Sequence, residues 1–426
     1  MGSHLRSVVY GVALSLAFAA SPAAARDLWT APFSGVRHLR RVEPGVDLHV
    51  VLVDLENPEV SVVATRPEDR FITTTAFARR YDAQVALNAN FYNQGSCGVA
   101  MGDGRLFERA YEDGCGASMA FGRANEAAVF DSTGAPRGPV PYAWVTEVFS
   151  GKPWLIRGGR ALTNWSRPQH VYRPNPRTAA GLTRDRHTLV LLAADGRRRD
   201  AEGITGFQMV EVLREFGAYD AVNLDGGGST TLVLGGEVAN QLSDRRERAV
   251  ITHLGVRITP GAVWYAGEIL PPANVLAATE GSAATLTFSV RNTGRRPWKG
   301  QDVSAPVLEL DDGEGAGGCR ATLEGAAGQG ETGVFTARWT PRNAGERALK
   351  LRLVAPDGAL MGTIVTLPVS VRGARRVSAE VRDPPVMAAS MGCQTAPSRG
   401  PSRLAWGCLA ALGAAVARLR RRRAAT

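Results

Sequence analysis

The chain has 426 residues, 44% of them hydrophobic, which is long enough for two or three domains with buried cores. Its net charge of +10 would suit a nucleic-acid partner, but eight positive charges lie in the terminal stretches: Arg6, Arg399, Arg403, Arg418, Arg420, Arg421, Arg422 and Arg423. A net charge of about +2 remains for the rest of the chain, so the composition argues against a nucleic-acid partner. The basic cluster Arg197–Arg199 is interpreted as a solvated loop.

Residues 1–25 have the pattern of a secretory signal peptide. Arg6 is followed by the apolar run Val8–Ala20 and by the small residues Ala23–Ala25. The pattern predicts export, which permits disulfides. Cys97 and Cys115 flank a glycine-rich loop, and a bond between them would stabilise the fold by roughly 3 kcal/mol. Cys319 has no obvious partner, and no cysteine spacing resembles a zinc site.

Residues 26–262 mix predicted strands with predicted helices. The segments 47–55, 60–65 and 187–196 read as strands. The segment 73–84 reads as a helix that is followed by a short strand ending near Asn88. The segment 206–216 is an amphipathic helix, with Gly217 as its C-cap, and it leads into a strand that ends just before Asp225.

Residues 267–372 read as strands alone. Alternating segments such as SAATLTFSVRN and RALKLRLVAPDG, separated by turn residues, predict a small β-sandwich. The stretches FSVRNTGRRPW and ARWTPRNAGERALKLRL resemble bacterial immunoglobulin-like accessory domains.

Residues 373–426 begin as a linker rich in Arg, Pro and Ser. The apolar run Leu404–Ala417 is shorter than a membrane span requires, and an arginine cluster follows it. Together with Cys393 in MGCQ, this pattern resembles a myxobacterial-type C-terminal sorting tail, and a plain membrane anchor is the alternative. Either way the tail is expected to engage the membrane or the sorting machinery, with the protein at the cell surface or the outer membrane.

Several common catalytic signatures are missing from the sequence. Ser229 lacks the final glycine of a G-x-S-x-G elbow, no lysine follows the glycines as in a Walker loop, and the histidines form no HExxH pair.

Three segments place polar groups within apolar surroundings. Asn88 and Asn90 follow a strand and can bind sugar hydroxyls, or they form an ordinary turn. Arg177 lies between a proline and a strand, where it can bind phosphate bidentately or form a surface ion pair. Asp225 precedes Gly226–Gly228, whose amides can form an anion-binding nest, or it caps its own loop.

The motifs LNANFY, NPRTAAGLT and YDAVNLDGGGSTTLVL resemble the phosphodiester glycosidase family over roughly Val50 to Ile258. The resemblance implies an α/β (α+β) fold with a mixed sheet and hydrolysis of sugar–phosphate diester linkages, as in the enzyme that removes N-acetylglucosamine from a mannose phosphodiester. It implies Asp225, Arg177 and Asn223 as catalytic residues. It implies these substrate-binding residues: Asn88, Asn90, Arg157, Gly226, Gly227, Gly228, Ser229, Thr230, Asp244 and Arg248.

Two departures from the family pattern are visible. Asn90 places a bulky amide where the first motif usually has a small residue. The turn Arg184–His187 replaces a glycine turn, a change expected to concern only a loop.

The mechanistic hypothesis is that Arg177 and the Gly226–Gly228 amides hold the phosphate while Asp225 activates water or attacks the anomeric carbon. No cofactor is expected. A divalent metal on Asp225 is conceivable, but no second carboxylate stands at ligand spacing.

The sequence allows two functions other than hydrolysis by Asp225. One is a non-catalytic surface module that binds anionic polysaccharide through the same residues. The other is a hydrolase with Ser229 as nucleophile, which would need the fold to bring in His253.

Overall fold

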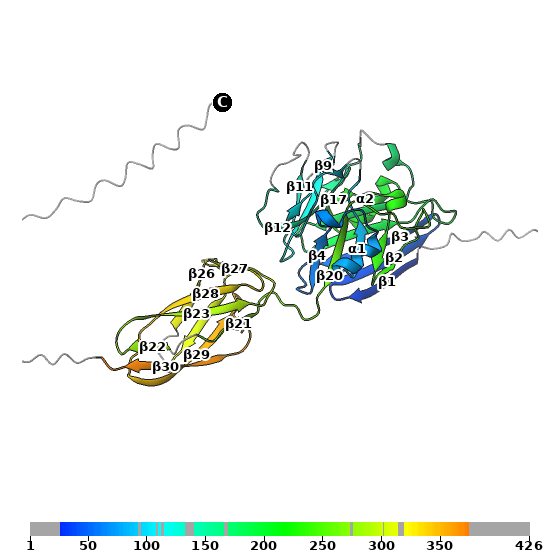
Figure 1. The fold of residues 1–426 in the computed structure, drawn as a ribbon. Helices are drawn as coiled ribbons and strands as arrows, with labels where there is room; N and C mark the ends of the chain where they lie inside the picture. The colour runs from blue at the N-terminus through cyan, green and yellow to red at the C-terminus, as the bar shows by residue number, and fades with distance from the viewer. Residues whose placement is uncertain are drawn as a thin grey trace, which may run out of the picture. The chain divides into compact units, whose positions relative to one another are not determined.

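The computed structural model describes residues 26–92, 95–107, 110–111, 115–132, 140–165, 169–272, 276–300, 302–313 and 319–374. The predicted signal peptide and sorting tail lie outside these ranges. Within them, no helix is long and apolar enough to cross a membrane. In Figure 1 the blue-to-green part of the chain carries both α-helices, and the yellow-to-orange part is built of strands.

In the described residues up to Ile258, the three larger sheets have antiparallel neighbouring strands. The largest has the order β1 (Arg26–Phe33), β2 (Val36–Glu43), β3 (Val46–Asp54), β16 (Thr188–Ala194), β15 (Arg177–Thr183), β17 (Ala218–Asn223), β13 (Trp154–Arg157) and β14 (Arg160–Ala161). The second has the order β11 (Ala127–Asp131), β10 (Ala117–Gly122), β12 (Val145–Gly151), β7 (Met101–Gly102) and β8 (Arg105–Leu106). The third has the order β19 (Glu237–Val238), β18 (Leu232–Leu234), β5 (Val85–Asn88), β20 (His253–Ile258) and β4 (Val60–Ala64).

The remaining elements of this part are short. A two-stranded parallel pair joins β6 (Ser96–Cys97) to β9 (Ala110–Tyr111). The helices are α1 (Thr74–Tyr81), α2 (Gly206–Glu215) and the 3₁₀ turns η1 (Pro67–Asp69), η2 (Gln169–Tyr172) and η3 (Gly227–Ser229). Cys97 and Cys115 form the predicted disulfide, with their Cα atoms 5.4 Å apart.

The two predicted α-helices are confirmed, and their caps explain their ends. Thr73 and Thr205 accept hydrogen bonds from the first turns of α1 and α2, and Thr205 forms a capping box with Gln208. Gly217 follows α2 at a φ of 82°, which a residue with a side chain rarely adopts.

The expected α/β fold with a mixed sheet is wrong, because the structure is nearly all β. The misleading signal is the unit β16–α2–β17. Both strands pair antiparallel with β15, which lies between them, so they run in the same direction and α2 connects them as in a βαβ unit. The sequence of this unit therefore resembles an α/β protein, although each strand has antiparallel neighbours.

Both faces of the largest sheet are buried at central strands such as β3 and β16, which explains the continuous apolar runs of these strands. Val51 and Val53 of β3 pack in a cluster with residues of the other two sheets, such as Leu87 and Phe121. The intervening Val50 and Leu52 pack on the opposite face, in a cluster that includes the following residues of α2: Met209, Val210, Val212 and Leu213. Covered faces produce apolar runs in antiparallel sheets as they do in parallel ones.

The second part has its own core, centred on buried side chains such as Trp298 and Phe335. Its strand order is β21 (Gly267–Ile269), β23 (Ala284–Asn292), β28 (Thr332–Trp339), β26 (Cys319–Glu324), β25 (Val307–Asp311), β29 (Gly345–Val354), β30 (Val365–Arg372) and β22 (Leu276–Thr279). A further pair joins β24 (Trp298–Lys299) to β27 (Ala326–Ala327). The segment is built of strands as predicted, while its immunoglobulin-like character and the domain boundaries stay predictions.

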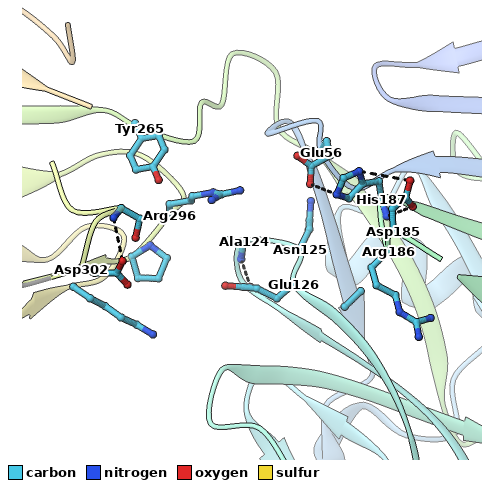
Figure 2. A pocket seen from close by; sticks show the side chains of 14 residues that line it. Glu56, Ala124, Asn125, Glu126, Asp185, Arg186, His187, Tyr265, Arg296 and Asp302 are labelled. Carbon is cyan, nitrogen blue, oxygen red and sulfur yellow. Dashed lines mark hydrogen bonds and ion pairs between the residues drawn. The ribbon is translucent and has the colours of Figure 1, made fainter. Parts of the chain in front are cut away.

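The turn Arg184–His187, which replaces a glycine turn, connects β15 to β16. Arg186 adopts a φ of 67° and donates to the Asp220 carboxylate at 2.5 Å. Figure 2 shows His187 between Glu56 and Asp185, with Nε2 3.6 Å and Nδ1 3.8 Å from their carboxylate oxygens. The turn itself is closed by the Arg186 N–H, which donates to the Thr183 carbonyl at 3.1 Å, at the end of β15 opposite Arg177.

Candidate active site

The antiparallel register of three strands assembles the candidate site. Arg177 begins β15 and pairs with Ala194, the last residue of β16. Two residues on, Ala179 pairs with Asn223, the last residue of β17. The start of β15 therefore lies between the exits of its two neighbours, and the segments after Ala194 and Asn223 emerge on either side of Arg177.

A pocket of about 190 Å³ lies at this place. Its lining contains the predicted residues Arg177, Asn223, Asp225, Gly226 and Gly227. It also contains Phe91 and three residues that the sequence interpretation had not placed there: Asn175, Arg197 and Leu224. The structure thus brings the three predicted catalytic residues together.

Asp225 is enclosed by protein atoms although the pocket gives it partial access to solvent. Burial raises the pKa of its carboxyl to about 6; the Ser229 side chain, the charge of Arg248 and the Gly226 backbone act in the opposite direction. Among the described residues that line the pocket, Asp225 is the single carboxylate. At neutral pH it is ionised and incompletely solvated, which suits a base or a nucleophile.

Two arginines face the same pocket. The buried Arg177 donates from Nε to the Ile204 carbonyl at 3.1 Å and from Nη2 to the Arg173 carbonyl at 2.7 Å, so its guanidinium is fixed. Burial and the neighbouring charge of Arg197 lower the pKa of Arg177 to about 10, which still leaves it charged at neutral pH. A fixed guanidinium beside a second one is a strong site for a phosphate group.

Arg197 lies in an exposed loop, as the sequence interpretation expects, and it is also part of the pocket. Its side chain is half exposed, but it lines the pocket and lies 3.9 Å from an Asp244 oxygen. Arg197 has a φ of 61° and closes a tight loop, with its backbone N–H donating to the Glu202 carbonyl. The sequence did contain a signal for the place of Arg197 in the pocket. Arg197 stands two residues after Asp195, an acid that follows a strongly predicted strand, and Asp225 likewise follows a predicted strand.

Asn223 supplies a polar group without a protein partner. Its Nδ2 donates to the Lys152 carbonyl at 2.6 Å, while its Oδ1 is buried and lacks a hydrogen-bond partner. An unpaired acceptor in a pocket is costly unless a ligand satisfies it. A substrate hydroxyl in the pocket is a suitable donor.

The glycine loop has a different role from the expected amide nest. The Gly227 N–H donates to the Pro176 carbonyl at 2.9 Å, and the Gly226 backbone hydrogen bonds to Asp225. Ser229 bonds the same carboxylate, and Thr230 accepts from Thr178 at 3.3 Å. These groups fix Asp225 and its loop, so stabilisation of anionic charge rests mainly on the arginines.

Asn88 and Asn90 are buried and do not line the pocket. Asn88 donates to the Asp225 backbone carbonyl and accepts from Thr178 and Thr231, each at 3.1 Å. Asn90 donates to the loop at Ser96 at 2.8 Å and accepts from the Ser150 N–H at 3.0 Å. Their contacts favour a positioning role, with Asn88 holding the segment that carries Asp225.

Asp244 and Arg248 form an ion pair at the edge of the site. Arg248 Nε donates to Asp244 at 2.7 Å, and both side chains lie where a Cβ on Gly228 would be. The predicted residue Arg157 lies elsewhere, half exposed, over the Trp154 ring and 3.1 Å from Asp131.

Asp195 is a further residue that the sequence interpretation missed. It is buried, and burial raises the pKa of its carboxyl to about 6. It accepts from Arg198 at 2.8 Å and from the Gln241 N–H at 2.9 Å. Asp195 thereby ties the loop of Arg197 to the segment that leads to Asp244.

The serine-nucleophile alternative has little support in the geometry. Ser229 bonds Asp225, whereas His253 is fully buried, stacked on Phe77, with its Nδ1 3.0 Å from the Thr65 hydroxyl. Burial lowers the pKa of His253 to about 3. In the described part of the chain, no group of three or more His, Cys, Asp or Glu side chains is placed to hold a metal ion.

The pocket therefore places one carboxylate beside two arginines, and comparisons with known proteins support a family. Residues 81–257 match the family model described as phosphodiester glycosidase. The N-acetylglucosamine-1-phosphodiester alpha-N-acetylglucosaminidase of Mus musculus is 36% identical over 111 residues, covering 23% of this chain and 21% of that protein. The Homo sapiens enzyme of the same name is 37% identical over 111 residues, with the same two coverages.

Solved structures also resemble the chain. The catalytic domain of the zebrafish enzyme of that name has 23% sequence identity and a TM-score of 0.43, covering 57% of this chain and 86% of that one. A hypothetical protein from Synechocystis has 16% identity and a TM-score of 0.45, covering 56% and 64%. The chain spans about a fifth of the length of the curated relatives that it matches.

Proposed function

We propose that this protein hydrolyses a glycosyl phosphodiester, releasing a sugar and a phosphate monoester. The observation that carries the proposal is Asp225, a carboxylate with a raised pKa that shares a small pocket with Arg177 and Arg197. The match of residues 81–257 to the phosphodiester glycosidase family supports the same chemistry.

Each pocket residue has a defined part in this mechanism. Arg177 and Arg197 bind the phosphate and stabilise the charge that grows as the bond from C1 to the phosphate oxygen breaks. Both electrons of that bond remain on the phosphate oxygen. Asp225 takes the proton of the attacking water, or attacks C1 itself before water releases the sugar. The Asn223 Oδ1 accepts a substrate hydroxyl and orients the ring.

A single carboxylate is sufficient for this leaving group. An ordinary glycosidase needs a second carboxyl group to protonate an alkoxide. A phosphate monoester leaves as a weak base, since its second pKa is about 6. The composition of the pocket therefore suits a phosphodiester better than an alkyl glycoside.

The test uses N-acetylglucosaminyl-α-phosphoryl-mannose in oxygen-18 water with the wild type, Asp225→Asn and Arg177→Ala. We expect labelled free sugar from the wild type and almost none from the variants. Label in the phosphate would indicate attack at phosphorus. The anomer first released distinguishes direct attack by water from attack by Asp225. Binding of anionic glycan without any release would favour the non-catalytic surface module and contradict the proposal.

We also infer that the reaction takes place outside the cytoplasm, on envelope or extracellular polysaccharide. The signal-peptide pattern of residues 1–25 and the Cys97–Cys115 disulfide support export. Fractionation of cells that express the tagged full chain tests this inference, and an unprocessed cytoplasmic product would contradict it.

A further inference from the structure

Two exposed aromatic side chains belong to segments that continue from the pocket and from its charged edge. Phe71 is 47% exposed and Tyr92 is 55% exposed. Their ring centroids are 5.1 Å apart and their planes meet at 86°, an edge-to-face pair. Tyr92 directly follows Phe91, which lines the pocket.

The backbone holds the Phe71 ring out in solvent. Phe71 has a φ of 61°, in the left-handed region that bulky residues avoid. Its N–H donates to the Val250 carbonyl at 3.0 Å, and the Val250 N–H donates to the Ile72 carbonyl at 3.0 Å. The backbone of Phe71 is thus strained at a residue whose side chain stays about half exposed, and such strain concentrates at functional sites.

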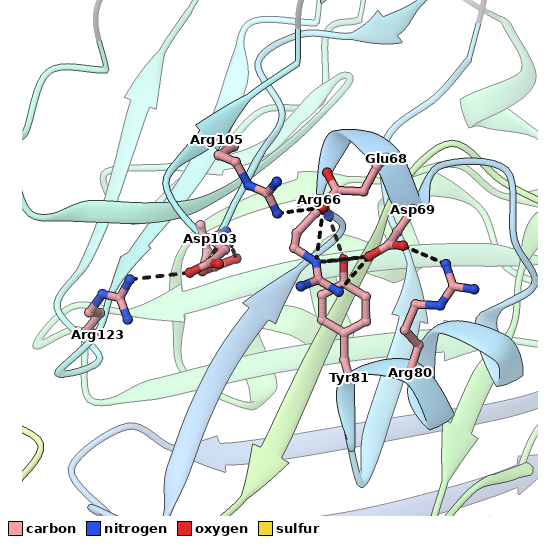
Figure 3. Close-up of polar contacts among 9 residues, drawn as sticks. Arg66, Glu68, Asp69, Arg80, Tyr81, Asp103, Arg105 and Arg123 are labelled. Carbon is pink, nitrogen blue, oxygen red and sulfur yellow. Dashed lines mark hydrogen bonds and ion pairs between the residues drawn. The ribbon is translucent and has the colours of Figure 1, made fainter. Parts of the chain in front are cut away.

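An ion-pair cluster, drawn in Figure 3, fixes the turn η1 just before Phe71. The buried Asp69 accepts from Arg80 at 2.6 Å, from Tyr81 at 2.8 Å and from Arg66 at 2.9 Å. Because Arg80 and Tyr81 belong to α1, the turn is held to a helix. Phe71 is therefore presented by a rigid segment.

Both rings adjoin residues of the site. Val250, the partner of Phe71, lies two residues after Arg248, whose charge acts on Asp225. The loop of Tyr92 is anchored from the other side, where the Cys97 N–H donates to the Phe91 carbonyl at 2.9 Å. The aromatic pair thus connects a segment that lines the pocket with a segment at its charged edge.

We propose that Phe71 and Tyr92 form a subsite for a second pyranose ring, the sugar that lies beyond the phosphate. This proposal rests on the function proposed above and specifies its substrate as a phosphate-linked glycan chain. Exposed aromatic rings offer apolar surface to the C–H face of a sugar, while a hydroxyl-bearing tip such as that of Tyr92 can also hydrogen bond. The continuity of the pair with the pocket favours a part of the same substrate over a separate protein partner.

The test compares two substrates and three variants. The short substrate is the methyl phosphodiester of N-acetylglucosamine-α-1-phosphate; the long one carries mannosyl-mannose in place of methyl. Phe71→Gly and Tyr92→Ala remove the rings, and Trp29→Ala removes an exposed ring from the edge strand β1 as a control. Glycine also relieves the positive φ of Phe71, so loss of folding will not explain an effect.

We expect each subsite variant to raise KM for the long substrate about tenfold and to leave the short one within about twofold. Trp29→Ala should change neither. An equal loss on both substrates would show that the rings support the fold of the site, and an unchanged KM for the long substrate would also overturn the proposal.

Binding measured by calorimetry separates this proposal from the function on which it rests. Both compounds are titrated into Asp225→Asn, alone and combined with Phe71→Gly. A loss of affinity limited to the long compound supports the subsite even if the wild type cleaves neither compound, and in that case only the proposed hydrolysis fails. Equal affinity in the two backgrounds would overturn the subsite whatever the catalytic result.

Discussion

Strand β17 has one acidic residue near its start and another just past its end, and the two carboxylates lie in different surroundings. Near its start, the buried Asp220 accepts from Arg186 at 2.5 Å and from the Gly158 N–H at 2.7 Å. Just past its end, Asp225 opens onto a pocket, and burial raises its pKa to about 6. The same strand thus carries one carboxylate neutralised by an ion pair and another kept available for chemistry. The ion pair with Arg186 thus distinguishes Asp220, the proposed structural acid, from Asp225, the proposed catalytic acid.

The largest expected effect is on catalysis. Asp225→Asn should lower kcat/KM by roughly 10²–10⁴-fold, because it removes the base or nucleophile. Hydrolysis measured on a glycosyl phosphodiester checks this loss. Residual activity above about a tenth of the wild type would show that another group performs the chemical step.

The same substitution should stabilise the fold at neutral pH. Since the folded-state pKa of Asp225 is raised, its stabilising contribution is complete below about pH 3.8 and is lost as pH rises through about 6. Asn cannot ionise, so the Asp225→Asn variant does not lose this stability as the pH rises. We expect its free energy of unfolding to exceed that of the wild type by about 2–3 kcal/mol at pH 7.5 and by almost nothing at pH 3.5. Denaturant unfolding at both pH values is the measurement, and a gain of equal size at both would contradict the electrostatic cause.

At Asp220, near the start of β17, we expect the reverse pattern: a large effect on stability and a small effect on catalysis. Asp220→Ala leaves Arg186 without its partner at a largely buried place and should cost about 3 kcal/mol of unfolding free energy, with kcat/KM changed by less than about threefold. The exposed Asp185→Ala in the neighbouring turn is the control, expected within about 0.5 kcal/mol. A large loss of activity with little loss of stability in Asp220→Ala would reverse the two assignments.

The pH profile tests what sets the ionisation of Asp225. For the wild type, kcat/KM should rise with pH through about 6, where the carboxylate forms. Arg248 lowers that pKa, so Arg248→Gln should move the rise to higher pH, whereas the exposed Arg246→Gln should not. A profile of Arg248→Gln that falls in amplitude without moving would assign Arg248 to binding alone.

The smallest expected effect concerns the glycine loop. A methyl group on Gly228 would meet the paired side chains of Asp244 and Arg248, which can move at little cost. Gly228→Ala should therefore lower kcat/KM roughly tenfold while leaving the unfolding free energy nearly unchanged. Gly373→Ala, at a glycine where a Cβ would make only ordinary van der Waals contacts at 3.8 Å and 3.9 Å, is the control. An unchanged kcat/KM would show that this ion pair does not serve the site.

Local signals in the sequence determined several elements. The apolar periodicity and the cap residues of 73–84 and 206–216 predicted both α-helices, since capping and amphipathic spacing act within one or two turns. The disulfide followed from two cysteines around one loop. The acid after a buried strand identified Asp225 as the centre of the candidate site.

Only the tertiary structure decided the fold class and the presence of a second arginine, Arg197, in the pocket. An apolar strand has the same sequence whether its neighbours run parallel or antiparallel, so the strands and helix of β16–α2–β17 do not by themselves reveal the direction of their neighbours. Arg197 enters the pocket because β15 places Arg177 beside Ala194, a pairing between residues distant in sequence. Asn88 and Asn90 belong to the LNANFY motif, yet their side chains face the interior. Strand pairing and burial set the direction of a side chain, and the composition of the motif does not reveal it.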